Sequence, residues 1–359
     1  MEWSRTGTCQ PIALSNEKGS RRRMRKRPIT TLPAAAGKTQ PGQTAASFKS
    51  GFIAIAGQPN TGKSTFLNLV LGRKVAIVTP KAQTTRTRIL GVCHRPDCQM
   101  VFLDTPGIHR PGASLFNKAM VRTAYEACQD VDVILYFIDA IRGIQEADRA
   151  ILGRLPLERS TLFLVMNKVD HLEDAKLFAH LQAVQDLPCA AVIPLSALTG
   201  YNVEHLLTLL PAHLPEGPRY FPDDQWTDQP EQFFAAEVIR EKLFMNLQKE
   251  LPYSLAVKLS KFQPRLPVGE KEIWDVEATI LVERESQKGI VIGQKGSMLK
   301  QVGSAARFEL ERIFGVQIFL KLWVKVRKEW GEDVALLRDL GYPAPGGETG
   351  DSGDDALLG

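Results

Sequence analysis

The sequence predicts an α/β fold, a doubly wound and mostly parallel sheet followed by a smaller α+β domain. Short apolar runs alternate with longer helical patterns between residues 51 and 210, which is typical of parallel strands covered by helices on both faces. Residues 214–230 then interrupt the alternation, because they are rich in Pro and Asp and have no period. The 359 residues of the chain are also enough for two domains.

The strands of the first domain are predicted from continuous apolar runs bounded by polar or turn residues. They are 51–57, 88–94, 99–105, 131–140, 161–168 and 190–197, of which the second and third form a hairpin. Helical periodicity predicts helices at 63–71, 177–185 and 203–210. In such a sheet the loops that follow the strands share one edge, where ligands bind.

The second domain is predicted to combine helices and strands around a glycine turn. The expected order is helix 231–249, strands 252–263 and 274–284, a short helix, the turn, helix 297–313 and strand 316–328. The predicted limits along the chain are a disordered basic extension 1–47, a first domain 48–214, a linker 215–230, a second domain 231–330, and a C-terminal segment with an acidic tail 331–359.

Basic residues are concentrated at the N-terminus. Residues 1–50 hold ten Lys or Arg and two acids, a net +8 within a chain of formal charge +5. A block of like charge repels itself and attracts phosphate-rich partners, so a solvated extension and a nucleic-acid-binding arm both stay open. Five scattered cysteines favour a reducing compartment, and we expect a cytoplasmic protein without a transmembrane helix.

A phosphate-binding loop is predicted at GQPNTGKS, residues 57–64, which fits G-x-x-x-x-G-K-[ST]. The motif lies between a predicted strand and a predicted helix, as its chemistry requires. Gly57 and Gly62 allow backbone conformations that turn N–H groups and a helix N-terminus toward an anion. Lys63 supplies a charge toward the β and γ phosphates, and Ser64 supplies a hydroxyl to Mg²⁺.

Three later motifs complete a predicted guanine-nucleotide site. DTPG (104–107) places Asp104 to hold Mg²⁺ and Gly107 to sense the γ-phosphate. NKVD (167–170) ends a predicted strand, and Asp170 accepts two hydrogen bonds that guanine donates and adenine does not. SAL (196–198) adds backbone N–H groups near the guanine oxygen.

The predicted functional residues form three sets. The nucleotide-binding set is Gly57, Gln58, Pro59, Asn60, Thr61, Gly62, Lys63, Ser64, Thr65, Asp104, Thr105, Pro106, Gly107, Asn167, Lys168, Val169, Asp170, Ser196, Ala197 and Leu198. The Mg²⁺ ligands are Ser64, Thr85 and Asp104, and the catalytic residues are Lys63, Thr85 and Asn60. Thr84 is the second candidate for the role given to Thr85.

The chain resembles the Era family of bacterial GTPases. The resemblance rests on GQPNTGKST, KAQTTRTRILG (81–91), LDTPGIHRP (103–111), NKVD and SALTGYNV (196–203). It continues into the second domain with REKLFMNLQKELPYS (240–254), ILVERESQKGIVIGQKG (280–296) and LKLWVKVRKEW (320–330). Both domains and their linker match in order, from about residue 50 to residue 343.

The resemblance implies that the second domain is a type II KH fold that binds single-stranded RNA. The implied target is the 3′ end of the 16S rRNA, and the implied role is assembly of the 30S ribosomal subunit by a monomer that binds GTP or GDP. Peripheral association with the inner membrane is a further trait of the family. A membrane-associated signalling GTPase with low hydrolysis is therefore the alternative function.

The residues of the second domain themselves favour RNA. GQKG (293–296) is a G-x-x-G turn between two predicted helices, the arrangement with which KH domains clamp a nucleic-acid backbone. Residues 283–328 hold ten Lys or Arg and four acids, and Ile290, Ile292 and Leu299 are predicted to form an apolar groove. The predicted RNA-binding residues are Arg284, Lys288, Ile292, Gly293, Gln294, Lys295, Gly296 and Lys300.

Hydrolysis is predicted to be slow. Ras-like enzymes orient the attacking water with a Gln shortly after the DxxG motif, whereas Ile108 and His109 follow Gly107 here. Asn60 and its family pattern suggest a K⁺ ion near the α and γ phosphates. We expect GTP to order residues 79–92, called switch I below, together with 107–120, and so to change how the KH groove is presented.

Overall fold

The computed structural model describes residues 48–110, 112, 114–248, 250–265 and 272–342. All of them belong to one compact unit, Ala46–Gly359. The predicted basic extension (1–47) and acidic tail lie outside the described residues.

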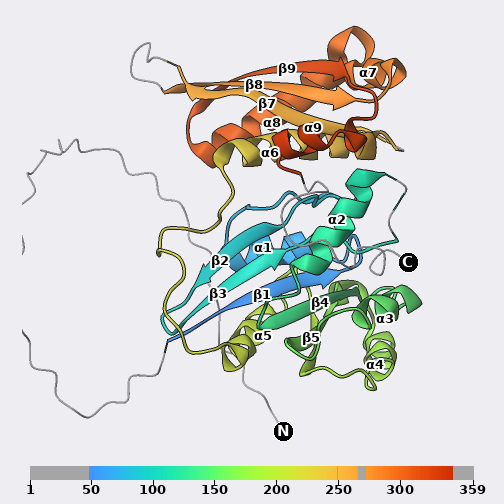
Figure 1. Ribbon diagram of the computed structural model, residues 1–359, viewed down its shortest axis with the longest axis vertical. Coiled ribbons are helices and arrows are strands. Elements are labelled where there is room, and N and C mark those ends of the chain that lie inside the picture. The colour runs from blue at the N-terminus through green and yellow to red at the C-terminus, as the bar shows by residue number, and fades with distance from the viewer. Residues whose placement is uncertain (1–47, 111, 113, 249, 266–271, 343–359) are drawn as a thin grey trace, which may run out of the picture. The chain divides into compact units, whose positions relative to one another are not determined.

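A six-stranded sheet forms the centre of the first domain, with the strand order β2-β3-β1-β4-β5-β6 (Figure 1). Only β2 and β3 pair antiparallel, so the predicted mostly parallel sheet and its hairpin are confirmed. The strands are β1 Lys49–Gly57, β2 Ile89–His94, β3 Cys98–Asp104, β4 Val133–Asp139, β5 Thr161–Asn167 and β6 Ala191–Leu195.

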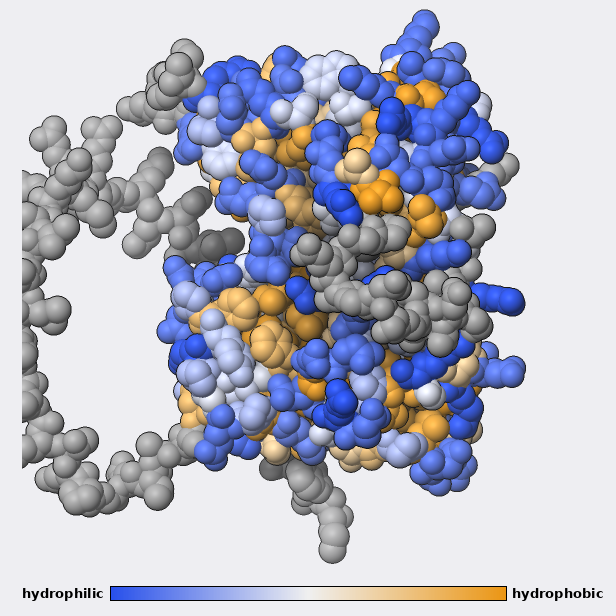
Figure 2. All heavy atoms as spheres, in the orientation of Figure 1, coloured by the Kyte–Doolittle hydropathy of each residue, from blue (hydrophilic) through white to orange (hydrophobic). Residues whose placement is uncertain are grey.

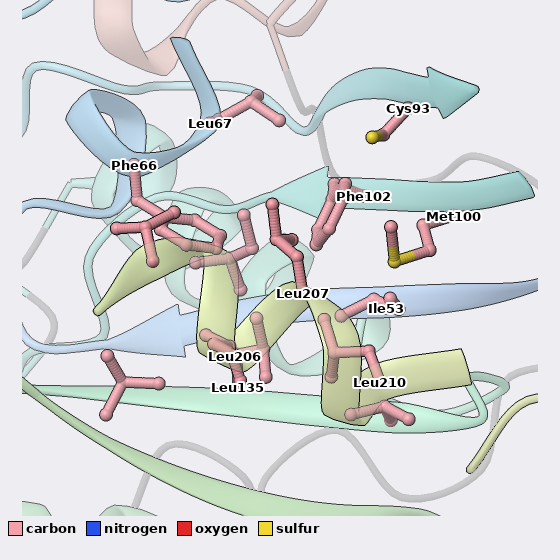
Figure 3. Close-up of a cluster of buried hydrophobic side chains, with 14 of the residues drawn as sticks. Ile53, Phe66, Leu67, Cys93, Met100, Phe102, Leu135, Leu206, Leu207 and Leu210 are labelled. Atoms are coloured by element: carbon pink, nitrogen blue, oxygen red, sulfur yellow. The ribbon is translucent and has the colours of Figure 1, made fainter. Parts of the chain in front are cut away.

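Helices cover both faces of this sheet. One face packs against α1 (Lys63–Leu71) and α5 (Val203–Leu209), and Figure 3 shows Phe66, Leu67 and Leu206 pointing toward side chains of the strands. Burying each such side chain contributes about 2–3 kcal/mol. The other face packs against α2 (Leu115–Glu126), α3 (Glu146–Leu152) and α4 (Asp174–Gln182), of which α2 and α3 were not predicted. Short 3₁₀ turns occupy Val169–His171 (η1) and Leu210–His213 (η2).

The second domain is a three-stranded sheet with helices on one face. β7 (Leu255–Pro264) pairs antiparallel with β8 (Ile273–Val282), which pairs parallel with β9 (Gln317–Val326). The helices are α6 Glu231–Asn246, α7 Glu285–Ile292 and α8 Ser297–Phe314, with the 3₁₀ turns η3 Leu251–Ser254 and η4 Gln294–Gly296. The predicted strand start at 252 was wrong, because Pro252 and its neighbours form η3 instead.

The segment after β9 adds two elements that were not predicted, η5 (Trp330–Glu332) and α9 (Val334–Asp339). Trp330, Leu337 and Tyr342 pack in one buried cluster with Phe116 of α2 and Ala256 of β7. This cluster joins the two domains. The predicted domain boundary near residue 330 therefore falls beside residues that both domains share.

The linker has neither a helix nor a strand, but it is held against the first domain. The backbone N–H of Val92 donates to the carbonyl of Trp226 at 2.9 Å. The guanidinium of Arg73 lies 3.9 Å from the centre of the Trp226 ring. The side-chain oxygen of Gln99 accepts hydrogen bonds from the backbone of Tyr220 (2.7 Å) and Phe221 (3.0 Å). The linker is thus fixed against β2 and β3 at one edge of the sheet.

The face shown in Figure 2 is mostly hydrophilic, with separate hydrophobic patches between polar side chains. Among the described residues, no helix has both the length and the apolar composition needed to cross a bilayer.

Candidate functional site

A cavity of about 650 Å³ opens at the edge of the sheet where the parallel strands β1, β3, β4, β5 and β6 have their carboxyl ends. It is lined by residues from each of the four predicted nucleotide motifs. The predicted residues on its wall are Pro59, Asn60, Gly62, Lys63, Ser64, Thr65, Thr85, Gly107, Asn167, Lys168, Asp170, Ala197 and Leu198.

Two glycines of the 57–64 loop have no room for a side chain. A Cβ on Gly57 would lie 2.4 Å from the Phe137 carbonyl oxygen, and one on Gly62 would lie 2.1 Å from the amide nitrogen of Asn167. Both glycines have positive φ, 138° and 93°. The loop therefore needs glycine for its backbone conformation and for its close contacts.

The side chain of Lys63 is fixed in position by hydrogen bonds within the protein. Its ammonium donates to the carbonyls of Gly57 (3.1 Å) and Gln58 (2.8 Å), and the residue is only 6% exposed. Burial lowers the pKa of Lys63 to about 8, and the charge of Asp104 opposes that shift. The lysine is thus a positioned charge at the base of the cavity, where α1 begins.

The three predicted Mg²⁺ ligands meet at one point. The Ser64 hydroxyl donates to Asp104 Oδ2 at 2.6 Å and lies 2.8 Å from the Thr85 hydroxyl. Burial raises the pKa of Asp104 to about 6, although the Ser64 hydrogen bond opposes the shift. The other carboxylate oxygen, Oδ1, is buried without a hydrogen-bond partner. Three oxygen donors with one unsatisfied carboxylate oxygen fit a hard cation such as Mg²⁺.

The structure separates the two threonine candidates of switch I. Thr85 turns its hydroxyl toward Ser64, whereas the Thr84 hydroxyl bonds Thr79 at 2.6 Å and donates to the Lys81 carbonyl at 2.8 Å. Of the two threonines, Thr85 is therefore the one whose hydroxyl joins the oxygen cluster of Ser64 and Asp104.

The residues of NKVD divide between bracing the site and facing the cavity. The Asn167 amide donates to the Thr61 carbonyl (2.7 Å) and accepts from the Ala197 N–H (2.9 Å). It thereby ties the phosphate loop to the SAL loop, a bracing contact that the sequence analysis did not predict. Lys168 has a left-handed backbone and donates to Asp139 at 2.7 Å. Asp170 keeps its carboxylate on the cavity wall beside His171.

Several predicted nucleotide-binding residues do not line the cavity but support it. The Thr105 hydroxyl donates to the Ile55 carbonyl at 2.9 Å, and the partly buried Val169 packs against the hydrophobic core. The predicted nucleotide-binding residues that do not line the cavity are Gly57, Gln58, Thr61, Asp104, Thr105, Pro106, Val169 and Ser196. Asp139 and Arg142, which the sequence analysis missed, do line the cavity. Their position was a signal for them, because Asp139 ends β4 and Arg142 follows it at the ligand-binding edge of the sheet.

The two residues after Gly107 do not replace the missing glutamine. Ile108 is buried in the core, and its N–H donates to the Gly57 carbonyl at 3.0 Å. His109 uses both ring nitrogens, one on the Gly107 carbonyl (2.8 Å) and one on the Gln83 side chain (2.9 Å). His109 does not line the cavity.

The second candidate site is the turn 293–296 between α7 and α8. Gly293 (φ 72°), Lys295 (φ 49°) and Gly296 (φ 77°) all have positive φ, and Lys295 and Gly296 are in the left-handed conformation. A Cβ on Gly293 would lie 2.7 Å from Met298 Cβ, whereas one on Gly296 would meet nothing within 4 Å. Gln294 and Lys295 between them are exposed. The turn therefore offers an open loop of backbone to a ligand.

The other predicted RNA-binding residues surround this turn. Arg284 and Lys300 are exposed, and Lys288 lies 3.7 Å from Glu285. Ile292 and Leu299 are half-buried, while Ile290 is 56% exposed. Apolar and cationic side chains thus lie along α7 and α8 on both sides of the glycines, as a single-stranded nucleic acid requires.

The fold and the two sites define a P-loop GTPase joined to a KH domain. Residues 52–168 match the family model described as a 50S ribosome-binding GTPase, and residues 250–331 match the KH domain model. The chain is 47% identical over 296 residues to the GTPase Era of Geobacter metallireducens, covering 82% of this chain and 98% of that protein. It is 44% identical over 295 residues to the GTPase Era of Staphylococcus haemolyticus, covering 82% and 97%.

Solved structures agree with these relatives. Era in complex with MgGDPNP and nucleotides 1506–1542 of 16S ribosomal RNA matches with a TM-score of 0.78 and 40% identity, over 82% of this chain and 99% of that one. An Era variant from Aquifex aeolicus bound to GDP.AlF4⁻ matches with a TM-score of 0.78, 39% identity and the same coverage. The chain belongs to the Era family of GTPases, and it is an enzyme that hydrolyses GTP to GDP and phosphate.

Proposed function

We propose that this GTPase binds the 3′ end of 16S rRNA through its KH domain and acts in assembly of the 30S subunit. The single observation that carries the proposal is the open G-x-x-G turn at 293–296, on a chain that matches an RNA-bound Era structure over 82% of its length. The turn belongs to the part of the chain that matches the KH model.

The RNA contacts follow from the geometry of the turn. The open side of Gly296 lets a sugar-phosphate backbone approach the protein backbone, and Lys295 supplies a cation beside it. The half-buried Ile292 provides an apolar surface for unstacked bases. The remaining members of the proposed set are Arg284, Lys288, Gly293, Gln294 and Lys300.

The nucleotide contacts follow from the cavity. Ser64, Thr85 and Asp104 would hold Mg²⁺, which would supply positive charge to the phosphates of the nucleotide. The N–H groups at the start of α1 and the Lys63 ammonium bind the phosphates. Asp170 recognises the guanine, and the N–H groups of residues 196–198 lie beside it.

Gly296→Asp tests the RNA proposal, with Gly315→Asp as the matched control. Both glycines have similar φ, 77° and 71°, both adjoin α8, and a Cβ on either meets nothing within 4 Å. The strain of the two substitutions is therefore matched. We expect Gly296→Asp to weaken binding of the 16S 3′-end RNA about tenfold or more, because a carboxylate meets phosphate, and Gly315→Asp to leave it within about twofold. Equal RNA affinities for both variants would reject the assignment.

The K⁺ ion belongs to the same proposal. Asn60 has a left-handed backbone (φ 63°) and lines the cavity, with its amide donating to the Pro80 carbonyl at 3.1 Å. Asn60 would help to hold K⁺ beside the phosphates, and the ion would supply the charge that other GTPases obtain from an arginine finger. Turnover in K⁺ should exceed turnover in Na⁺ at equal ionic strength, and Asn60→Ala should remove the difference. Equal turnover in the two salts for the unaltered chain would contradict the ion.

Location and assembly state also remain proposals. We place the chain in the cytoplasm as a monomer, with peripheral contact to the inner membrane through the cations of residues 18–27. That contact is the basis of the alternative function, a membrane-associated signalling GTPase with low hydrolysis. Flotation with anionic vesicles, for the full chain and for a chain lacking residues 1–47, tests it. The alternative requires that only the full chain floats.

A further inference from the structure

Arg86 of switch I is buried among residues of the second domain. It directly follows Thr85 in the chain and is only 2% exposed. Its guanidinium donates to the carbonyls of Leu255 (2.7 Å), Pro252 (3.1 Å) and Tyr253 (3.2 Å). These three carbonyls belong to η3 and the first residue of β7, within the part of the chain that matches the KH model.

Four aromatic rings surround the same guanidinium. The distances from its carbon to the ring centres are 5.3 Å for Phe116, 5.5 Å for Phe244, 5.7 Å for Tyr342 and 5.9 Å for Trp330. Phe116 comes from α2, after the DTPG motif, and the other three come from α6 and the C-terminal segment. We call these four rings the aromatic cage. The cage therefore joins both nucleotide-sensing segments of the first domain to the KH domain.

The charge of Arg86 is held without a carboxylate partner among the described residues. Carbonyls and ring faces stabilise it, and its Nε has no hydrogen-bond partner. Arg240 on α6 also has a buried nitrogen without a partner, Nη1, but it differs in its charge pairing, because it forms an ion pair with Glu237 and also donates to the Thr84 carbonyl. Arg86 is thus the less compensated of the two buried cations, so its burial depends on the rings of the aromatic cage and on the three backbone carbonyls.

We propose that Arg86 is a positioning residue that makes the Mg²⁺ contact of Thr85 depend on the KH domain. The side chains of the two consecutive residues are fixed at different places, Thr85 at Ser64 and Arg86 in the cage. A displacement of η3 or of the cage withdraws Arg86 and with it the Thr85 hydroxyl. Conversely, a ligand that fixes the KH domain in the present arrangement holds switch I in the metal-binding arrangement.

Arg86→Gln in the full chain tests the proposal, with Arg88→Gln as the matched control because Arg88 is an exposed arginine two residues further on. At saturating GTP we expect Arg86→Gln to raise the Mg²⁺ concentration for half-maximal turnover about tenfold and to lower kcat about tenfold. The affinity for GDP should stay within about twofold, since Arg86 does not line the cavity. Arg88→Gln should behave as the unaltered chain. An unchanged Mg²⁺ requirement in Arg86→Gln would overturn the proposal.

Two further variants keep the test decisive if Arg86→Gln does not fold. Arg86→Lys keeps the charge but does not bridge the carbonyls of Pro252 and Leu255 together, so a smaller shift in Mg²⁺ requirement is expected. Tyr342→Leu removes one ring of the cage outside the first domain and should shift the requirement in the same direction. Wild-type Mg²⁺ dependence in both variants, with GDP binding intact, contradicts the proposal.

A final measurement adds the 16S 3′-end RNA, and this part rests on the proposed function. The RNA should raise turnover of the unaltered chain but not of Arg86→Gln, while both bind the RNA with the same affinity. If the unaltered chain does not bind the RNA, the proposed function fails and the Mg²⁺ result still decides the role of Arg86. If RNA raises turnover equally in both proteins, Arg86 does not link the domains.

Discussion

Helices α1 and α8 are built alike at both ends, yet they have different functions. Each begins after a glycine with a left-handed backbone, Gly62 (φ 93°) and Gly296 (φ 77°). Each also ends at such a glycine, Gly72 (φ 63°) and Gly315 (φ 71°). In both helices the N-terminal turn faces the proposed phosphate ligand, as the helix dipole favours.

The two turns differ in what surrounds them. The α1 turn is packed against Asn167, and its lysine, Lys63, is buried and already hydrogen-bonded. The α8 turn is open at Gly296, and its lysine, Lys295, is exposed. A preorganised turn suits one small ligand bound in a fixed pose, whereas an open turn suits a polymer whose backbone is bound without fixing each atom. The same local structure therefore serves two kinds of recognition because its environment differs.

The largest expected effect is that of Gly62→Ala on nucleotide binding. A Cβ there would displace the Asn167 amide, which also holds Thr61 and Ala197. We expect the affinity for GDP to fall by about 3.5 kcal/mol, roughly 300-fold. Titration with a fluorescent GDP analogue measures it. Gly72→Ala is the control, since it strains the other end of α1 with nothing within 4 Å, and should leave affinity within about twofold. Similar losses in both variants would mean that strain alone matters.

The second-largest expected effect concerns recognition of the guanine base. Asp170→Asn should lower GTP affinity by about 2–3 kcal/mol, roughly 30–150-fold, because two hydrogen bonds to a carboxylate are lost. Discrimination against ATP should fall in parallel. Competition between GTP, ATP and XTP reports it, and XTP should become the preferred nucleotide. An unchanged order of preference would show that the base is recognised elsewhere in the cavity. RNA binding at the α8 turn should not change.

Lys295→Ala should have a moderate effect, restricted to RNA. Because Lys295 is an exposed side chain on an open turn, we expect RNA affinity to fall about fivefold and the salt dependence of binding to weaken by about 0.7 in the log–log slope. Lys321→Ala on β9 is a suitable control, since that lysine lies on a strand near Glu277. A loss of GTP binding in Lys295→Ala would contradict the separation of the two turns.

The smallest expected effect is a dependence of GDP affinity on pH, which the buried Lys63 should produce. The pKa of Lys63 is lowered to about 8 by burial, so the nucleotide-free protein loses this proton as pH rises through 8. Phosphate binding needs the charged form, so GDP affinity should fall about fourfold between pH 7 and 8.5. Calorimetry at pH 8.5 in two buffers should show proton uptake on binding. A constant affinity, with no proton uptake, would show that Lys63 stays charged.

Local sequence patterns predicted the elements that carry their own signals. Helix α1 was predicted at its observed limits, because an apolar stripe is bounded by glycines at both ends. Helix α2 has no such boundary and was missed, although it carries Phe116 into the aromatic cage. The start of β7 was placed too early, since the apolar pattern does not reveal that Pro252 begins a 3₁₀ turn.

The sequence by itself determined the order of the motifs, the positions of Gly57 to Ser64 and Gly293 to Gly296, and the family to which the chain is similar. These features are encoded in short runs of residues, because glycine, proline and apolar spacing constrain the backbone locally. Only the tertiary structure decided that Thr85 rather than Thr84 meets Ser64, that Asn167 braces two loops, and that Arg86 enters the KH domain. Those contacts join residues 21 to 169 positions apart, and packing between distant segments, not local propensity, selects them.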